Sequence, residues 1–193
     1  LARRSGNEML FQMLASENVE KLNDYRVKKI VTQCPHCLNA LKNEYPDLGG
    51  NYEVLHHSQY LKQLQEEERI PEGKNGRKVT YHDPCYLGRY NKEYDAPREI
   101  LHQTSFSVTE MQRHRNESFC CGAGGARMWM EENLGTRINE ERVRQALETD
   151  ADTIATGCPF CMTMLSDGIA SSGKNESLET RDIAELMLES IKS

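Results

Sequence analysis

Apolar residues recur at helical spacing in two stretches, Glu8–Leu22 and Thr136–Leu147, with good helix formers between them. A short apolar and β-prone run follows each stretch, at Lys29–Thr32 and Thr153–Ala155. Both runs end at a Cys-Pro-x-Cys tetrapeptide, and proline is favoured in the first turn of a helix. The pattern therefore predicts a unit of helix, strand, cysteine turn and helix that occurs twice in the chain.

A further strand is predicted within Arg77–Cys85, where an apolar run ends in a turn. A helix is expected at about Ala96–Gln103, with Asp95 as its N-cap. Strands that alternate with helices are typical of parallel sheets with helices packed on their faces. The sequence thus predicts an α/β fold of two Rossmann-like repeats, with parallel sheets flanked by helices.

An internal repeat relates the two units. When Cys34 is set on Cys158, the offset is 124 residues, and the match continues without a gap as far as Leu64, which falls on Leu188. Chance is a poor explanation for agreement over such a length. The repeat is also far longer than the period of a solenoid, so we interpret it as a duplicated domain.

The first repeat is expected to be incomplete. Leu1 corresponds to Gly125 at this offset, so the counterparts of everything before Gly125 would precede the chain. We therefore expect the C-terminal fragment of a longer protein; a complete protein with a half-sized first repeat is the alternative. Residues 1–70 would be the end of the first repeat and residues 71–193 the whole second repeat, and the polar stretch Glu66–Gly76 between them is the best linker.

Five of the seven cysteines fall in the second repeat, each where a strand or loop turns into the next element. Such positions meet at one end of a parallel sheet. Adjacent side chains of an extended segment point to opposite sides, so two neighbouring cysteines suit different irons of one cluster better than a single ion. Gly122 lets the backbone approach the cluster and offers an N–H donor. We predict one iron–sulfur cluster held by Cys85, Cys120, Cys121, Cys158 and Cys161.

Other uses of these cysteines remain open. A structural zinc site would normally take two Cys-x-x-Cys pairs, whereas the second repeat has one. A vicinal disulfide or buried structural cysteines are further alternatives. Cys34 and Cys37 belong to the first repeat and are expected to be an incomplete metal site, free, oxidised or holding an adventitious metal.

Composition narrows the class of protein. The net charge of −6 and the pI near 5.6 argue against a nucleic-acid partner, because phosphate-binding surfaces are usually basic. No run approaches the roughly 18 apolar residues of a membrane helix. The cysteines lack the spacing of a secreted disulfide scaffold, which indicates a reducing, cytoplasmic compartment.

Three segments carry a family resemblance: HDPCYLGRY (residues 82–90), FCCGAGG (residues 119–125) and TGCPFC (residues 156–161). They resemble the cysteine-rich CCG domains of heterodisulfide reductase and related respiratory iron–sulfur proteins, which usually carry two such domains in tandem. The segment ARRSGNEMLFQMLA (residues 2–15) is most similar to sequences of one branch of this family, the membrane-associated electron-transfer-flavoprotein:menaquinone oxidoreductases.

The resemblance implies an iron–sulfur electron-transfer domain of an oxidoreductase that passes electrons from a reduced flavoprotein towards menaquinone. It also implies a [4Fe–4S] cluster, noncubane as in the heterodisulfide reductase branch, on the five cysteines named above. Upstream iron–sulfur and membrane domains would place the protein on the cytoplasmic face of the membrane, and the fragment alone would be inactive. A disulfide-reducing or hydroxy-acid-oxidising relative and a zinc-stabilised interaction module are the alternatives.

Several residues near the cysteines are further candidates. His82 is expected to donate a hydrogen bond to the centre, to relay protons or to stabilise a turn, and Arg89 and Arg127 to offset thiolate charge or to lie in solvent. An ordinary strand-edge pair is favoured over a metal site for His56 and His57. The segment after the glycines is expected to cover the cluster or to pack in the core rather than to bind quinone; it comprises Met128, Trp129 and Met130.

Overall fold

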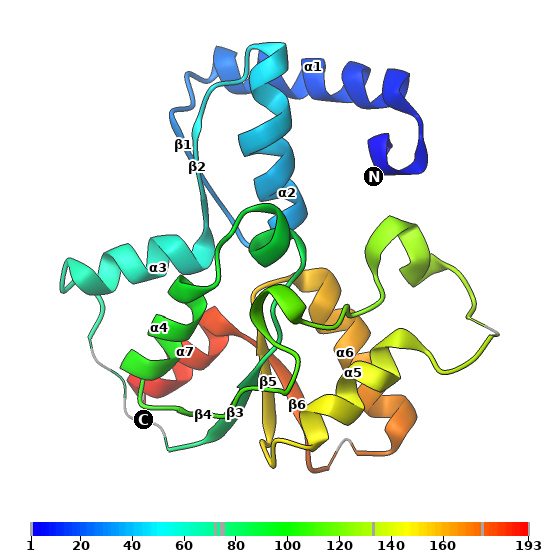
Figure 1. Ribbon diagram of the computed structural model, residues 1–193. Coiled ribbons are helices and arrows are strands. Elements are labelled where there is room, and N and C mark those ends of the chain that lie inside the picture. Colours follow the sequence, from blue (N-terminus) through cyan, green and yellow to red (C-terminus); the bar gives the residue numbers. More distant parts are fainter. Residues whose placement is uncertain (1, 72, 74–75, 133, 175, 193) are drawn as a thin grey trace.

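Two parallel sheets organise the computed structural model, which describes residues 2–71, 73, 76–132, 134–174 and 176–192 (Figure 1). The first sheet pairs β1 (Lys29–Thr32) with β2 (Glu53–His56). The second sheet has the order β4-β3-β5-β6, and all its pairs are parallel. Its strands are β4 (Ser107–Val108), β3 (Lys78–Tyr81), β5 (Thr153–Thr156) and β6 (Glu179–Asp182).

Helices connect the parallel strands and cover the sheets (Figure 1). They are α1 (Glu8–Asp24), α2 (Pro35–Asn39), α3 (His57–Glu66), α4 (Asp95–Gln103), α5 (Ile138–Leu147), α6 (Pro159–Ser172) and α7 (Ile183–Lys192). Together with the two parallel sheets, they confirm the predicted α/β fold with flanking helices.

The second sheet is buried on both faces. Ile154 joins an apolar cluster with residues of α5 and α6, such as Val143 and Leu165. The next residue, Ala155, joins a second cluster that includes Ile100 of α4 and residues of α7. Successive side chains of a strand point to opposite faces, so two helical layers enclose this sheet. The Cys-Pro-x-Cys turn after β5 is therefore held on a rigid strand.

The predicted repeat is present in the structure from β1 to Gly49 in the first unit and from β5 to Gly173 in the second. β1 and β5 begin and end at an offset of 124 residues, and each is followed by a helix with proline in its first turn. Gly49 and Gly173 both end helical segments with positive φ, 83° and 67°. Only glycine adopts this left-handed conformation without steric cost.

The offset changes to 126 residues at β2 and β6, and α3 and α7 keep the new offset. The predicted gapless match of Leu64 with Leu188 is therefore wrong, because the loop after Gly173 is two residues longer than the loop after Gly49. The linker predicted at residues 66–76 begins at the last residue of α3 and otherwise falls between α3 and β3, with residues 72, 74 and 75 outside the described residues.

The start of α4 differs slightly from the prediction. Tyr94 is at the N-cap, and Asp95 is the first helical residue. The carboxylate of Glu93 accepts hydrogen bonds from the backbone N–H groups of Asp95 and Ala96, at 3.2 and 2.9 Å. The capping role predicted for Asp95 is thus performed by a carboxylate two residues earlier.

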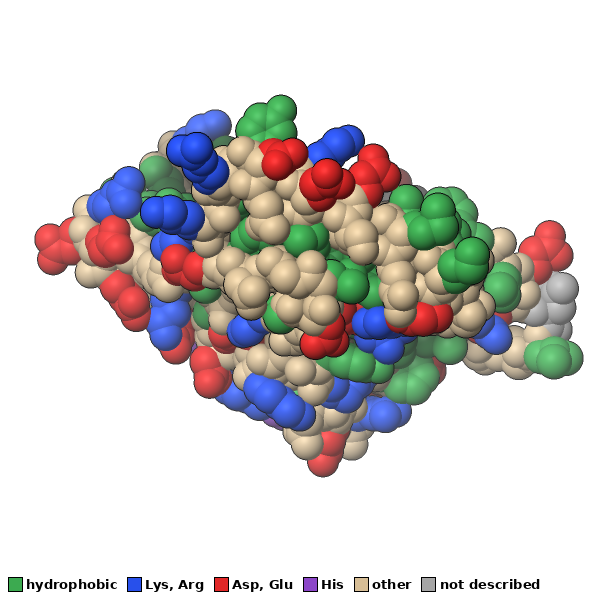
Figure 2. Space-filling view, turned by 90° about the horizontal axis from the view of Figure 1, so that it is seen from above, with side chains coloured by type: hydrophobic (Ala, Val, Ile, Leu, Met, Phe, Trp, Pro, Cys, Tyr) green, Lys and Arg blue, Asp and Glu red, His purple; other side chains and the backbone are tan. Residues whose placement is uncertain are grey.

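The first unit leaves apolar surface exposed. β1 pairs only with β2 among the described residues, whereas its counterpart β5 has a neighbour on each side. Seen from above, hydrophobic side chains are exposed on the face that carries α1 (Figure 2). The exposed apolar residues of α1 are Met9, Leu10, Met13 and Leu14.

Candidate metal centre

Three separate segments bring cysteines to the carboxyl ends of β3 and β5. Cys85 follows β3 and precedes the helical turn Tyr86–Tyr90. Cys158 is the N-cap residue of α6 and keeps an extended backbone, while Cys161 lies in the first turn of that helix. Cys120 and Cys121 come from the loop that leads to the glycine-rich segment.

Close sulfur contacts join all five cysteines of the second repeat. The Sγ atoms of Cys161 and Cys121 are 3.3 Å apart. The Cys120 thiol contacts both Cys121 and Cys85, and Cys161 also contacts Cys158. The structure therefore brings together the whole set that the sequence analysis singled out. Cys121, Cys158 and Cys161 are buried, whereas Cys85 and Cys120 are half-buried.

Electrostatics divide the five thiols into acceptors and donors. Hydrogen bonds from Cys121 and Cys85 lower the pKa of Cys120 to about 2, and a hydrogen bond from Cys161 lowers the pKa of Cys158 to about 6. The donation to Cys120 raises the pKa of Cys121 to about 12 and that of Cys85 further. Protons shared between sulfurs in this way are the protons that a metal displaces when it binds.

Gly122 takes part in the cysteine loop through its backbone. Its N–H lies 3.3 Å from the Cys120 sulfur, to which it donates. Its φ is +91°, and a Cβ atom at this position would lie 3.2 Å from the Cβ of Ile138. The backbone can approach the sulfurs here because the residue has neither a side chain nor a strained dihedral.

His82 lies at the end of β3, next to the buried sulfurs. One of its ring nitrogens and the sulfurs of Cys121 and Cys161 all lie within 4.8 Å of one another. Its Nδ1 accepts a hydrogen bond from Nε of Arg142 at 3.0 Å. Burial holds the pKa of His82 well below its usual value, so the ring is neutral. The histidine is therefore available as a hydrogen-bond donor to the cysteines.

A buried ion pair fixes the turn that carries Cys85. Arg98 of α4 binds both carboxylate oxygens of Asp83, at 2.8 and 2.9 Å, and also Glu110 at 2.6 Å. Asp83 accepts a further hydrogen bond from the backbone N–H of Arg115 at 2.7 Å. Asp83 thus joins the Cys85 turn to the loop that leads to Cys120.

The two cysteines of the first repeat face the second set across His36. Interactions with Cys158 and Cys34 raise the pKa of His36 to about 9 against the effect of burial. A hydrogen bond from Cys37 lowers the pKa of Cys34 to about 4, and the same bond raises the pKa of Cys37. The ring of His36 lies 4.1 Å from the Tyr86 ring, centroid to centroid.

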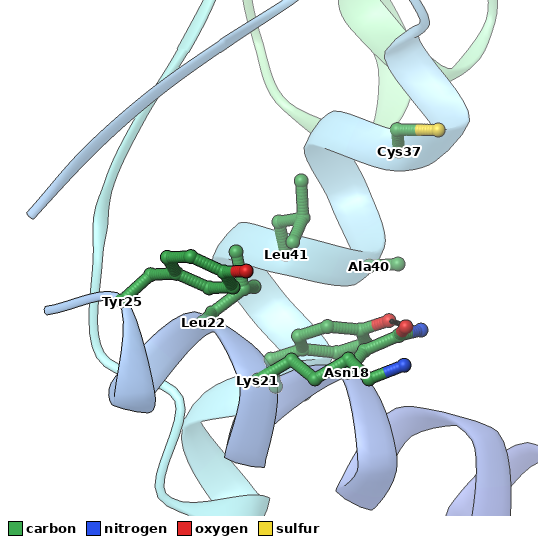
Figure 3. Close-up of a pocket in the computed structure, with 8 residues that line it drawn as sticks. Asn18, Lys21, Leu22, Tyr25, Cys37, Ala40 and Leu41 are labelled. Atoms are coloured by element: carbon green, nitrogen blue, oxygen red, sulfur yellow. Dashed lines mark hydrogen bonds between the residues drawn. The ribbon is translucent and has the colours of Figure 1, made fainter. Parts of the chain in front are cut away.

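Two cavities adjoin the first pair of cysteines. One, of about 380 Å³, opens beside Cys34 and Cys37 towards the glycine-rich segment and is also lined by Arg4, Tyr86, Met128, Trp129 and Phe160. The other, a groove of about 440 Å³, lies between α1 and the helical residues 37–45 that begin in α2, with Cys37 at one end (Figure 3). Its other lining residues are Asn18, Lys21, Leu22, Tyr25, Ala40, Leu41 and Tyr45.

The two arginines proposed to offset thiolate charge differ in position. Arg89 donates to the backbone carbonyl of Ser118 at 2.7 Å, and its charge opposes the raised pKa of Cys85. Arg127 is exposed and pairs with Glu132 at 2.7 Å. Arg89 therefore supports the cysteine loop, whereas Arg127 is a surface residue.

Core packing, one of the two expected roles, is wrong for Trp129 and Met130, which are 73% and 57% exposed. Met128 does pack against the core cluster that contains the cysteines. His56 is fully buried rather than part of an ordinary strand-edge pair, and its Nε2 lies 2.9 Å from the Gly157 carbonyl oxygen. His57 pairs instead with Asp182 at 3.0 Å.

Two important residues were not identified from the sequence. Arg142 falls on the buried face of α5 together with Asn139, Val143 and Ala146, and a charged residue in such a stripe was an available signal. His36 lies inside the first cysteine tetrapeptide, but its proximity to Cys158 depends on tertiary structure and has no local signal.

The donor set fits an iron–sulfur cluster. Five sulfurs joined in one series of contacts exceed the four ligands of a tetrahedral ion. The backbone N–H of Gly122 already points at a cysteine sulfur, as donors do around such clusters. The guanidinium of Arg142 is buried nearby without a carboxylate among its described hydrogen-bond partners, which favours an anionic centre.

Comparison with known proteins defines the class first. The family described as "CCG: Cysteine-rich domain" matches residues 1–42 and 79–166, which together contain all seven cysteines. The chain therefore belongs to the CCG cysteine-rich domain family, as its resemblance predicted.

Three curated relatives make the placement more specific. The chain is 46% identical to the EtfAB:quinone oxidoreductase of Syntrophomonas wolfei over 96% of its length and 27% of that protein. It is 47% identical to the probable iron-sulfur-binding oxidoreductase FadF of Bacillus subtilis, over 98% and 27%. It is 38% identical to one of the subunits of the dihydromethanophenazine:CoB–CoM heterodisulfide reductase of Methanosarcina barkeri, over 92% and 44%. The chain thus spans between about a quarter and a half of these relatives.

None of the helices in the part of the chain that the structure describes combines the length and the apolar character needed to cross a bilayer.

Proposed function

We propose that this chain is the iron–sulfur electron-transfer domain of an oxidoreductase. The observation that carries the proposal is the unbroken series of sulfur contacts from Cys85 through Cys120, Cys121 and Cys161 to Cys158. A cluster bound there would accept and donate single electrons. The protein supplies the thiolates, excludes water with a buried apolar shell and fixes the loops through the pairing of Asp83 with Arg98.

The five cysteines are proposed as ligands of a single [4Fe–4S] cluster, with a noncubane arrangement favoured by the fifth sulfur. Cys120 and Cys121 support this assignment because they are adjacent in sequence yet contact different partners, Cys85 and Cys161. Gly122 contributes its N–H to the Cys120 sulfur.

A zinc site is the second candidate, favoured by the close approach of His82, Cys121 and Cys161. The hydrogen bond from Arg142 opposes it. Nδ1 of His82 accepts from Arg142, so the neutral ring carries its hydrogen on Nε2 and has no free lone pair there for a metal. Zinc takes four ligands, so a zinc site made of thiols alone would also leave one of the five cysteines unused.

Measured iron and acid-labile sulfide separate these candidates. We expect anaerobically purified protein to be coloured and to contain about four irons per cluster. In the protein of residues 1–193, Cys161→Ser should abolish the visible absorbance, whereas Cys37→Ser, which changes the corresponding residue of the first repeat, should retain it. A colourless protein with one tightly bound zinc would refute the iron–sulfur proposal.

For the electron path, we propose transfer from a reduced flavoprotein towards menaquinone in the complete enzyme. The 46% identity to a protein named EtfAB:quinone oxidoreductase supports this assignment. Membrane association would come from regions outside these residues. The intact enzyme should oxidise reduced flavoprotein in the presence of a menaquinone analogue. Activity with a disulfide or a hydroxy acid in its place would assign the chain to another branch of the family.

We further propose that residues 1–70 are part of one CCG repeat and residues 71–193 a complete second repeat. The groove between α1 and α2 supports this division. Its residues Cys37, Ala40 and Leu41 correspond, at the offset of 124, to Cys161, Met164 and Leu165. In the second repeat these positions are buried together with Met111 and Cys121, which come from the earlier half of that repeat.

The groove and the open edge of β1 are therefore proposed to accept a polypeptide segment that would complete the first site. That segment would supply a parallel strand beside β1. It would also supply the further cysteine ligands that a cluster on Cys34 and Cys37 requires. Iron analysis tests the proposal. The complete protein should contain a second cluster that is lost in Cys37→Ser and retained in Cys161→Ser. One cluster in the complete protein, insensitive to Cys37→Ser, would refute it.

A further inference from the structure

Arg142 is fully buried and has neutral acceptors at its described hydrogen bonds. Its Nε donates to Nδ1 of His82 at 3.0 Å, and its Nη2 donates to Oγ of Ser118 at 3.2 Å. Its Nη1 donates to the carbonyl oxygen of Arg113 at 2.8 Å and to Oε1 of Gln145 at 2.9 Å. These bonds account for four of the five N–H groups of the guanidinium, and none of them balances its charge with a carboxylate.

A second buried arginine, Arg98, has the more usual environment, in which carboxylates balance the buried charge. Arg98 has nearly the same burial, but it binds Asp83 through two hydrogen bonds and Glu110 through two more. Asp83 is thus already engaged by Arg98. An isolated buried charge costs several kcal/mol. Burial accordingly lowers the pKa of Arg142 to about 10, while the charge of Asp83 and, less strongly, that of Cys161 act in the opposite direction. Because Asp83 already forms its ion pair with Arg98, the cysteines are the anionic group that we assign to Arg142.

His82 lies between Arg142 and the sulfurs. Its backbone is fixed, because its N–H donates to the Ala155 carbonyl oxygen at 2.9 Å in the neighbouring strand. Its Nδ1 is occupied by the Arg142 donor, so the hydrogen of the neutral ring is on Nε2. A ring nitrogen of His82 lies within 4.8 Å of the sulfurs of Cys121 and Cys161, and Nε2 is the ring nitrogen that is left to donate to this group.

We propose that Arg142 is a positioning residue of the cysteine centre that holds His82 in the Nε2–H tautomer and directs this donor at the sulfurs. The proposal rests on the iron–sulfur function proposed above. One electron that enters the centre adds one negative charge, and neither His82 nor Arg142 gains or loses a proton. A nearby N–H donor and a buried cation stabilise the more negative state, so both residues raise the reduction potential.

Redox titration followed by electron paramagnetic resonance tests this role in the cluster-loaded protein. In Arg142→Met we expect the equilibrium constant for one-electron reduction to fall at least tenfold, which corresponds to 59 mV. Arg142→Lys, which keeps the charge and one donor, should recover most of the loss. Arg144→Gln on the exposed side of the same helix is the matched control and should leave the potential unchanged. A potential in Arg142→Met equal to that of the control would overturn the proposal.

His82 provides variants that do not alter the guanidinium. His82→Gln retains an N–H donor near the position of Nε2 and should keep the potential close to that of the unaltered protein, whereas His82→Leu should lower it. Equal potentials in these two variants would contradict the donor role. If the unaltered protein forms no cluster, the proposed function fails instead, so the two failures are distinguishable.

A spectroscopic measurement on the unaltered protein covers the case in which the variants do not fold. Nitrogen-15 resonances of histidine in the diamagnetic, metal-free protein report which ring nitrogen carries the hydrogen. We expect His82 to be protonated at Nε2 and unprotonated at Nδ1 at neutral pH. The opposite tautomer, or a doubly protonated ring, would overturn the proposal without any reference to cluster activity.

Discussion

Nε2 of His56 lies 2.9 Å from the carbonyl oxygen of Gly157, 101 positions later in the chain. His56 ends β2 in the first unit, and Gly157 immediately precedes Cys158 in the second. The other ring nitrogen, Nδ1, lies 2.7 Å from the hydroxyl of Ser58. This histidine therefore connects the first sheet to the backbone of the second cysteine turn.

The pH dependence of folding stability should report this contact. Burial lowers the pKa of His56 to about 3 in the folded protein, whereas an unfolded histidine has a pKa of about 6.5. Between these values the unfolded chain binds a proton that the folded chain does not, so stability falls as the pH falls. From pH 7.5 to pH 5 this loss is about 2 kcal/mol.

Denaturant unfolding of reduced, metal-free protein at both pH values measures the effect. His56→Gln should lose about 2 kcal/mol less than the unaltered protein over this range. His102→Gln, at an exposed position, is the control and should keep the full pH dependence. An unchanged pH dependence in His56→Gln would show that this histidine does not titrate as expected.

Gly122 should be the least replaceable glycine of the cysteine loop. Gly122→Ala places a side chain at a φ of +91° and within 3.2 Å of Ile138, so a cost of about 1–3 kcal/mol is expected together with a lower iron content. Gly125→Ala meets the backbone strain alone, since its φ is +64° and it has open space around it. Gly124→Ala meets neither obstacle and should be nearly neutral. Equal losses in all three variants would contradict this order.

The buried pair of Arg98 and Asp83 should dominate the stability of the Cys85 turn. Arg98→Met leaves a buried carboxylate without its cation and should cost about 3–5 kcal/mol. Arg144→Met breaks an exposed pair with Glu141 and should cost less than about 1 kcal/mol. Combining Arg98→Met with Asp83→Asn should recover part of the loss, because the buried side chain at position 83 is then uncharged, while the partly exposed Glu110 still lacks its cation. Unfolding by denaturant measures the stability of all three variants. A double variant less stable than Arg98→Met would argue against an unpaired Asp83 carboxylate as the cause of the loss.

Local signals were sufficient for much of the fold. The bounds of β1 were predicted from a four-residue apolar run, and the starts of α2 and α6 from Pro35 and Pro159. These features depend on residues that are neighbours in sequence. The change of offset after Gly173 was missed because it depends on loop length, to which residue-by-residue matching without gaps is insensitive.

The five cysteines could be identified from the sequence because metal-binding segments have unusual spacing. Their environment could not. The hydrogen bond between Arg142 and His82 joins residues 60 positions apart, and no local pattern encodes such a contact. His36 has no distinguishing feature in the sequence between Cys34 and Cys37, for the same reason. Only the packing of the first unit on the second places it beside Cys158.

In the first pair of cysteines, the less exposed residue, Cys34, should react faster than the more exposed Cys37. Cys37 is the more exposed of the two, but it donates to Cys34, which raises the pKa of Cys37 and lowers that of Cys34 to about 4. Only the thiolate is alkylated. In metal-free protein, the reaction of Cys34 with iodoacetamide should therefore be nearly independent of pH between 8 and 5, and faster at pH 6 than that of Cys37.

Peptide mass spectrometry of partially alkylated protein measures both rates. Cys37→Ala removes the donor and should make the rate at Cys34 depend on pH, whereas Cys37→Ser keeps a hydroxyl donor and should largely preserve the flat profile. His36→Phe should have a smaller effect in the same direction as Cys37→Ala, since the histidine is the lesser of the two donors to Cys34. If the rate at Cys34 falls tenfold for each pH unit below 8, its thiolate is not stabilised. The first tetrapeptide would then be no more prepared for a metal than an ordinary pair of thiols.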